Sequence, residues 1–197
     1  ARYGAPQHWT VENFRIDNGS DGIKQGLDKY SGFDCLMLGV WDDKTFSSGG
    51  DLTNARIYQK VFLEAGKSYF GANFNTLYNL NAAYIFASDG LINTSEMETN
   101  SIAYLSIMAC KSDDKFYGIF FTLDKPQEVV LGFQADLQGG AMRQEFRASS
   151  LKLLQYGVTA IDHPRNEVIP FTGTPRYYSL TGVELPRPPQ KGLFIMK

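Results

Sequence analysis

The sequence has little cysteine and little histidine, and this excludes several kinds of site. Only 2 of its 197 residues are Cys and only 2 are His. Neither Cys35 nor Cys110 has a second Cys or a His at metal-ligand spacing, which excludes a zinc site of the usual kind. Both stand inside apolar runs, and we interpret them as buried thiols or at most one disulfide. Neither His8 nor His163 fits the pattern of a Ser-His or Cys-His catalytic set.

Long apolar runs and an excess of positive charge are also missing. No stretch approaches the roughly 18 to 20 consecutive apolar residues that a membrane-spanning helix requires. The formal net charge is −2 at pH 7, so no basic surface stands out for a phosphate backbone, and we expect no nucleic-acid partner. The chain begins at Ala1 without Met, which we interpret as a mature or trimmed product or as a cloned fragment.

Aromatic residues and glycine are abundant. The sequence contains 14 Phe, 11 Tyr and 19 Gly, a mixture that favours strands and tight turns over helices. Short strand patterns follow one another without alternating helices, which argues against a sheet of βαβ units. We therefore predict an all-β fold, a β-sandwich or jelly roll, with a short C-terminal β appendage.

Several segments carry clear strand patterns. In residues 129–137 the apolar side chains share one parity, which predicts a half-buried strand. Residues 33–41 are apolar almost throughout, as in a strand covered on both faces. Residues 55–63 and 68–74 flank a short Gly-containing turn, so we expect a hairpin. Further strands are predicted at 8–14, where Trp9 is assigned to the core, and at 82–87, 116–123 and 142–156, the last with a bulge near 149–150.

Two boundaries need separate arguments. Residues 93–110 stay open between helix and strand, because Ser95 and Glu98 have the spacing of a capping box while residues 102–109 have a strand pattern. After Gly157 the chain contains six of its eight prolines. We therefore divide it into a sandwich domain, 1–157, and a Pro-rich linker with a short β tail, 158–197.

Two regions combine aromatic rings with planar polar groups, the mixture that sugar recognition uses. In the first, Trp41 leads through Asp42 and Asp43 into a loop rich in Gly and Ser. The second surrounds the end of a strand and contains Asn75, Tyr78, Asn79 and Asn81. The alternative, that Trp41 and Tyr78 only cover the core, stays open.

Acidic and amide side chains suggest two further chemistries. Asp17, Asn18 and Asp21 are hard oxygen donors in a Gly-containing loop, and Glu145 of a later strand completes a candidate calcium site. The EF-hand pattern is absent, and a plain turn built on these residues is the alternative. Glycoside hydrolysis needs two carboxylates, for which Asp42–Asp43 and Asp113–Asp114 are the candidates. Acidic pairs in loops are commonly solvated turn residues, so we expect binding rather than catalysis.

Five segments carry a resemblance to a known family: residues 8–14, 38–41 with the loop after them, 56–70, 129–137 and 146–154. Their order resembles a galactose-binding-like jelly-roll module, similar to carbohydrate-binding modules, of the surface and periplasmic polysaccharide-utilisation proteins of Bacteroides-type bacteria. The resemblance spans about residues 7–157. The last part of the chain, residues 177–185 and 189–195, resembles the short carboxy-terminal tails of many secreted proteins of those bacteria.

The resemblance implies a β-sandwich, export to the cell surface, periplasm or extracellular space, non-catalytic glycan binding in many members, and a structural calcium in some. We therefore expect a carbohydrate-binding or adhesion module of an exported protein, with Trp41 and Tyr78 among its contacts. Two alternatives remain. One is a jelly-roll glycoside hydrolase or lyase with a carboxylate pair, and the other is a structural or assembly domain that binds a partner chain at the cell surface.

Overall fold

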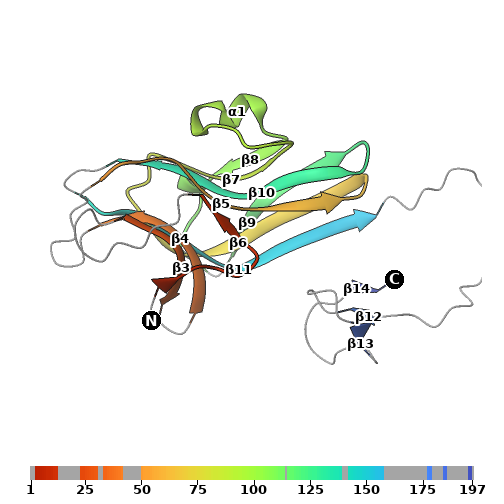
Figure 1. Ribbon diagram of the computed structural model, residues 1–197, viewed down its shortest axis with the longest axis horizontal. Helices are drawn as coiled ribbons and strands as arrows, with labels where there is room; N and C mark the ends of the chain where they lie inside the picture. Colours follow the sequence, from red (N-terminus) through yellow and green to blue (C-terminus); the bar gives the residue numbers. More distant parts are fainter. Residues whose placement is uncertain are drawn as a thin grey trace, which may run out of the picture. The chain divides into compact units, whose positions relative to one another are not determined.

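Two antiparallel sheets lie face to face in this computed structural model (Figure 1). The structure describes residues 3–12, 23–30, 33–41, 50–113, 115–138 and 142–157, and three short strands that follow them. The sheet that we call the front sheet has the order β1-β3-β4-β11-β6-β9, and the back sheet has the order β2-β5-β10-β7-β8. The chain is therefore a β-sandwich of the jelly-roll kind, as its strand patterns predicted.

The elements have the following bounds. The front sheet consists of β1 (Tyr3–Gly4), β3 (Ile23–Tyr30), β4 (Phe33–Val40), β6 (Gly66–Tyr78), β9 (Phe116–Leu123) and β11 (Gln144–Gly157). The back sheet consists of β2 (Thr10–Val11), β5 (Leu52–Leu63), β7 (Ala82–Ser88), β8 (Ala103–Ser106) and β10 (Gln127–Leu137). Between β7 and β8 lie a 3₁₀ turn (Thr94–Glu96) and α1 (Met97–Asn100), and a second 3₁₀ turn (Ile107–Ala109) follows β8.

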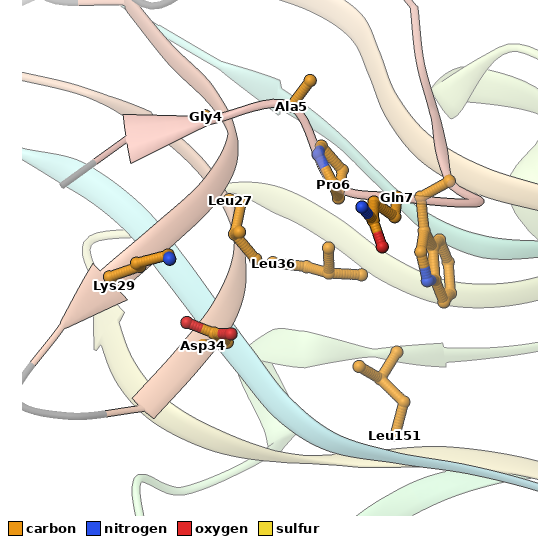
Figure 2. A pocket seen from close by; sticks show the side chains of 10 residues that line it. Gly4, Ala5, Pro6, Gln7, Leu27, Lys29, Asp34, Leu36 and Leu151 are labelled. Carbon is orange, nitrogen blue, oxygen red and sulfur yellow. The ribbon is translucent and has the colours of Figure 1, made fainter. Parts of the chain in front are cut away.

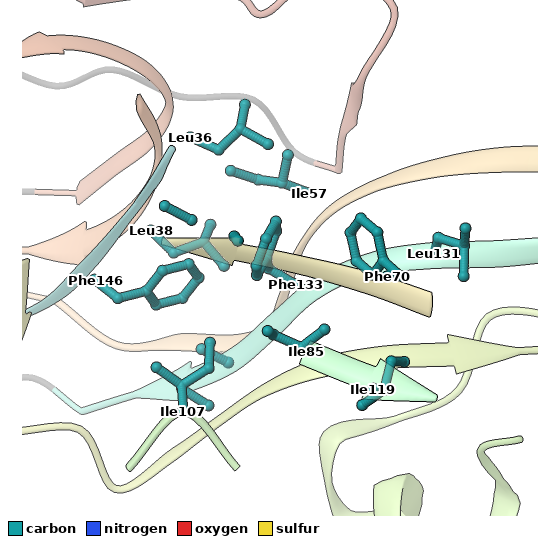
Figure 3. Close-up of a cluster of buried hydrophobic side chains, with 14 of the residues drawn as sticks. Leu36, Leu38, Ile57, Phe70, Ile85, Ile107, Ile119, Leu131, Phe133 and Phe146 are labelled. Carbon is teal, nitrogen blue, oxygen red and sulfur yellow. The ribbon is translucent and has the colours of Figure 1, made fainter. Parts of the chain in front are cut away.

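One hydrophobic core fills the space between the sheets (Figure 3). At its centre Phe133 of the back sheet lies between Phe70 and Phe146 of the front sheet, with ring centroids 5.8 and 5.7 Å apart. Burying a side chain of this size stabilises the fold by about 1.5–3 kcal/mol. Trp9 is half-buried and packs against Phe70 and Phe133 with ring centroids 6.4 and 6.3 Å away, so its predicted contact with the core is confirmed.

Two predicted strands are present, but one is more deeply buried than expected. In β4 every residue from Cys35 to Val40 is buried, which confirms a strand covered on both faces. In β10 the predicted inward residues are buried, and so is Val130 on the opposite side. Val130 packs against Met97 of α1, which lies over the outer face of the back sheet (Figure 1). The prediction that this strand is half-buried was therefore wrong, because a distant segment covers its second face.

The predicted hairpin of residues 55–63 and 68–74 is also wrong. β5 pairs with β2 and β10 in the back sheet, whereas β6 pairs with β9 and β11 in the front sheet. Only Glu64 and Ala65 connect them, and Gly66 has a φ of 124°. A side chain rarely tolerates that φ, so glycine here lets the chain cross from one layer to the other. Alternating residues look the same in both arrangements, so the sequence pattern could not separate them.

The open segment 93–110 contains both kinds of structure. The capping box is made by Asn93 and Glu96 in place of the expected Ser95 and Glu98, since the backbone N–H of Asn93 donates to Glu96 Oε2 at 2.9 Å. A strand follows at Ala103–Ser106. The predicted bulge of β11 is present, with a register shift between Ser149 and Lys152.

The contacts within the chain divide it into two units, Ala1–Thr159 and Ala160–Lys197. In the second unit β12 (Tyr177–Tyr178) pairs with β13 (Glu184–Leu185) and β14 (Ile195–Met196). These strands fall within or next to the two short strands predicted for the tail.

Candidate functional site

Trp41 follows β4 directly, and its ring folds back over the outer face of the front sheet. A Cβ atom on Gly39 would lie 2.5 Å from Trp41 Cζ3, so only glycine leaves room for the indole there. Trp41 is 2% exposed. The ring predicted to stack on a sugar is therefore covered in this structure.

Three cations surround the Trp41 ring. Lys24 Nζ lies 4.2 Å from the ring centroid, and the guanidinium carbons of Arg143 and Arg147 lie at 4.7 and 5.4 Å. Lys24 also donates to the Trp41 carbonyl oxygen at 2.6 Å. A cation over an indole face contributes about 0.5–2 kcal/mol, more when water is excluded. The indole thus holds together side chains from β3 and β11.

Two carboxylates bind the two arginines. Arg147 Nε donates to Asp28 Oδ2 at 2.7 Å, and Arg147 Nη1 donates to Glu145 Oε1 at 2.6 Å. Arg143 Nη2 donates to the same Glu145 oxygen. The strand register brings these residues together, because Lys24, Gly39, Glu145 and Tyr78 stand opposite one another across β3, β4, β11 and β6.

This ion cluster is buried, which makes it a structural element. Glu145, Asp28 and Lys24 have no exposed surface, and Arg147 is 1% exposed. Burial raises the pKa of Glu145 above its ordinary range, while the charges of Arg147 and Arg143 oppose that rise. A calcium ion at Glu145 would have to share its carboxylate with two guanidinium groups. The other predicted calcium ligands, Asp17, Asn18 and Asp21, lie outside the described residues, so the calcium site stays a prediction.

Tyr78 stands at the rim of this cluster and is 48% exposed. The Arg143 guanidinium carbon lies 4.8 Å from its ring centroid, so Arg143 lies near the rings of both Tyr78 and Trp41. Asn79 donates from Nδ2 to the Arg143 carbonyl oxygen at 2.9 Å, and Asn75 Oδ1 accepts from Cys35 Sγ at 3.5 Å.

The structure thus brings Trp41 and Tyr78 to one face, while two of the predicted amides make contacts within the protein. Asn81 is exposed beyond the strand end, and Asp42 and Asp43 lie outside the described residues.

A cleft of about 650 Å³ opens elsewhere, where the N-terminal segment passes over the ends of β3 and β4 (Figure 2). Its apolar wall consists of Pro6, Trp9, Leu27, Leu36 and Leu151. Such a volume falls within the roughly 300–1,000 Å³ of small-ligand sites. Trp9 has a double role, because it packs on the core rings and also lines the cleft.

The polar groups of the cleft come from β3, β4 and the N-terminal segment. Lys29 and Asp34 are directly opposite each other in the β3–β4 pair, two residues beyond the opposed Leu27 and Leu36. Because side chains two apart share a face of a strand, the inner face changes here from apolar to charged. Gln7 adds an exposed amide on the other side of the cleft, as Figure 2 shows. The cleft therefore offers an indole, a carboxylate, an ammonium group and an amide.

Cys35 and Cys110 form no disulfide with each other. Burial, and then the charge of Asp28, raises the pKa of Cys35 to about 11. Burial, and then Asp113, raises the pKa of Cys110 to about 11 as well. Neither thiol is activated as a nucleophile, since reactive cysteines have lowered pKa values.

Sequence reasoning missed β3, and with it Lys24, Asp28 and Lys29. The strand has no apolar alternation, because its inner face carries the polar Gln25 and Lys29 beside Ile23 and Leu27. It also missed Arg143 and Arg147, which stand in a predicted strand but carry no local signal of pairing. Asp34 lies in a predicted strand next to Cys35, and only the register with β3 places it at a cleft. Gln7 was missed too, and the one sequence feature that could have pointed to it is its position two residues before Trp9.

No protein-family model matches the chain, and no curated protein matches it. Among solved structures it is similar to a cleaved adhesin domain of Lys-gingipain from Porphyromonas gingivalis, with a TM-score of 0.44, 14% identity, and coverage of 76% of this chain and 91% of that one. It is also similar to a variant of CBM29-2, a family 29 carbohydrate-binding module, with a TM-score of 0.31, 13% identity, and coverage of 76% and 92%. Scores this low decide nothing about function.

Two further findings concern a membrane-spanning helix and a glycosidase site. No helix within the described part of the chain is long and apolar enough to cross a membrane. Among the described residues that line the cleft, Asp34 is the one carboxylate. Asp28 and Glu145 both bind Arg147, but neither has exposed surface. Within the described ranges, therefore, no pair of accessible carboxylates faces this cleft, as a glycosidase would need.

Proposed function

We propose that the chain is a non-catalytic carbohydrate-binding module and that the cleft at Trp9 holds the sugar. The observation that carries the proposal is the composition of this cleft. It has an apolar wall that includes an indole, and three planar or charged polar groups also line it. The proposal rests on these side chains and on none of the solved structures above.

The apolar wall and the polar side chains of the cleft contribute to sugar binding in different ways. The apolar C–H face of a pyranose ring packs on Trp9 and Leu151, which removes apolar surface from water. Asp34 accepts hydrogen bonds from two neighbouring hydroxyl groups, and Lys29 donates to the ring or hydroxyl oxygens. Gln7 donates and accepts from the opposite side. Mixed donors and acceptors suit hydroxyl groups, which do both.

Three finer statements belong to the same proposal. The module acts in adhesion or polysaccharide capture, as part of an exported protein. Tyr78, with Arg143 beside it, is a second contact for the glycan because its ring is 48% exposed. The Trp41 ring packs against the Arg143 guanidinium group. Substitution of Trp41 would therefore affect glycan binding through Arg143.

Affinity electrophoresis tests the proposal. Wild-type protein is run in native gels containing soluble glucomannan, xyloglucan, dextran or mucin, and we expect retardation by at least one of them. The double variant Gln7→Ala/Asp34→Ala should lose that retardation. Asp124→Ala is the matched control, because it removes an exposed carboxylate that does not line the cleft. A wild-type protein retarded by no polysaccharide would refute the function, and equal retardation of the double variant would refute the site.

A further inference from the structure

The N-terminal segment passes from one sheet to the other and forms one side of the cleft. β1 pairs with β3 in the front sheet, and β2 pairs with β5 in the back sheet. Residues 5–9, which we call the crossing segment, connect these two strands and belong to neither. All of them except His8 line the cleft (Figure 2). The position of the crossing segment therefore decides where two of the proposed sugar contacts, Gln7 and Trp9, lie.

A hydrogen bond from β5 holds the crossing segment. Gln59 Nε2 donates to the carbonyl oxygen of His8 at 2.9 Å. The strand register brings Gln59 there, because Thr10 stands opposite Tyr58 and Gln59 is one residue further along towards the crossing segment. Within the described residues, no other hydrogen bond ties residues 6–9 to either sheet. This bond therefore fixes the backbone between the two contacts.

His8 has a backbone conformation that few residues adopt. Its φ is 63°, in the left-handed region, where residues other than glycine are uncommon and where Asn, Asp and His occur more often than the rest. Such a conformation persists where surrounding contacts hold it, and residues of this kind are frequent at ligand-binding sites. His8 itself accepts the bond from Gln59, and the chain turns at Gln7 and His8 just before Trp9. The unusual conformation thus lies between the two residues that would contact the sugar.

We propose that Gln59 and His8 are positioning residues of the cleft, which hold Gln7 and Trp9 where the sugar binds. This inference rests on the proposed function. A segment that is ordered before the ligand arrives loses little further conformational freedom on binding, so the affinity is higher than it would be with a free segment. Gln59 does not line the cleft and acts only through the crossing segment.

Affinity electrophoresis with the polysaccharide that retards wild type measures the effect of this bond. Gln59→Ala should raise the dissociation constant about two- to tenfold, because it removes the hydrogen bond that orders the crossing segment. Gln155→Ala is the matched control, because Gln155 Nε2 donates to the Glu64 carbonyl oxygen at 2.7 Å and neither residue lines the cleft. The control should bind like wild type. Both variants should unfold in urea close to the wild-type midpoint, which separates positioning from loss of the fold.

Two substitutions of His8 test the turn. His8→Asn and His8→Val both remove the imidazole, but Asn tolerates the left-handed region and a β-branched residue does not. His8→Asn, the conservative variant, should keep the wild-type affinity, whereas His8→Val should bind as weakly as Gln59→Ala. A double-mutant cycle tests the route of the effect. The effect of Gln59→Ala should shrink in a Gln7→Ala background and stay the same with Asp34→Ala, because Asp34 belongs to β4.

The outcomes separate this inference from the proposed function. If wild type is retarded and Gln59→Ala is retarded equally, or if Gln155→Ala weakens binding as much, the bond does not position the site, while the cleft keeps its function. Equal affinities of His8→Asn and His8→Val would overturn the role of the turn. A Gln59→Ala variant that loses affinity only together with its folded structure would make the bond a structural one. A wild-type protein that no polysaccharide retards would overturn the proposed function and this inference with it.

Discussion

Arg147 binds Asp28 across the outer face of the front sheet, with 2.7 Å between Nε and Oδ2 and with almost no exposed surface on either side chain. The same guanidinium group holds Glu145. Replacing Arg147 by Met would leave two buried carboxylates without their shared partner. We expect Arg147→Met to lower the free energy of unfolding by about 3–5 kcal/mol, measured by urea denaturation followed by circular dichroism.

An exposed ion pair supplies the control for this variant. Lys60 and Glu128 of the back sheet are 3.5 Å apart, and more than half of each side chain is exposed. Lys60→Met should change the free energy of unfolding by about 1 kcal/mol or less, since water screens exposed pairs. An Arg147→Met variant as stable as Lys60→Met would contradict the burial of the cluster.

Gly71 of β6 and Gly118 of β9 are opposite each other against the Tyr69 ring, and they give a second prediction about stability. A Cβ atom on Gly118 would lie 2.4 Å from the carbonyl oxygen of Phe70, which is backbone and cannot move aside cheaply. We expect Gly118→Ala to destabilise the protein by about 1–3 kcal/mol. Gly90→Ala should be close to neutral in the same thermal or urea melts, because nothing lies within 4 Å of a Cβ atom there. Equal effects of the two substitutions would mean that Tyr69 and Phe70 do not pack as described.

The two buried thiols predict a dependence on pH. Burial raises the pKa of Cys35 and of Cys110 from 9.0 to about 11. A raised pKa in the folded state stabilises the fold fully below pH 9, and this contribution is lost as the pH rises towards 11. Cys35→Ala should therefore lose less stability than wild type between pH 9 and 11.

Reaction with a thiol reagent checks the burial of both cysteines. At pH 8 the native protein should not react with Ellman's reagent, whereas both thiols should react in concentrated urea. Rapid reaction of one thiol in the native protein would show that it is accessible.

The two tryptophans show how far the sequence could predict the structure. Local patterns identified β4, β10 and the bulge of β11, because period and residue type are properties of the segment itself. The exposure of a tryptophan is not such a property. Trp41 is covered because Lys24, Arg143 and Arg147 come from other segments of the chain, and Trp9 lines a cleft because residues of β3, β4 and β11 lie beside it.

The site was harder to predict than the fold for the same reason. Asp34 and Lys29 meet only through the β3–β4 register, and β3 lacks the apolar alternation that identifies a strand. The predicted ring of Tyr78 is exposed, but its neighbours Asn75 and Asn79 bind other parts of the protein. Long-range pairing therefore decides which polar groups are available for a ligand.

Titration of ¹⁵N-labelled protein with the polysaccharide that retards it tests the central claim most directly. The chain has two tryptophans, so its spectrum contains two indole N–H signals, which Trp9→Phe assigns. Trp9 lines the cleft, whereas Trp41 is 2% exposed and covered by cations. We expect the Trp9 signal to shift with added glycan, and to shift further than the Trp41 signal, because the Trp41 indole meets the glycan only through Arg143. A shift of the Trp41 signal alone, or of neither signal while the glycan is bound, would contradict the assignment of the cleft as the carbohydrate site.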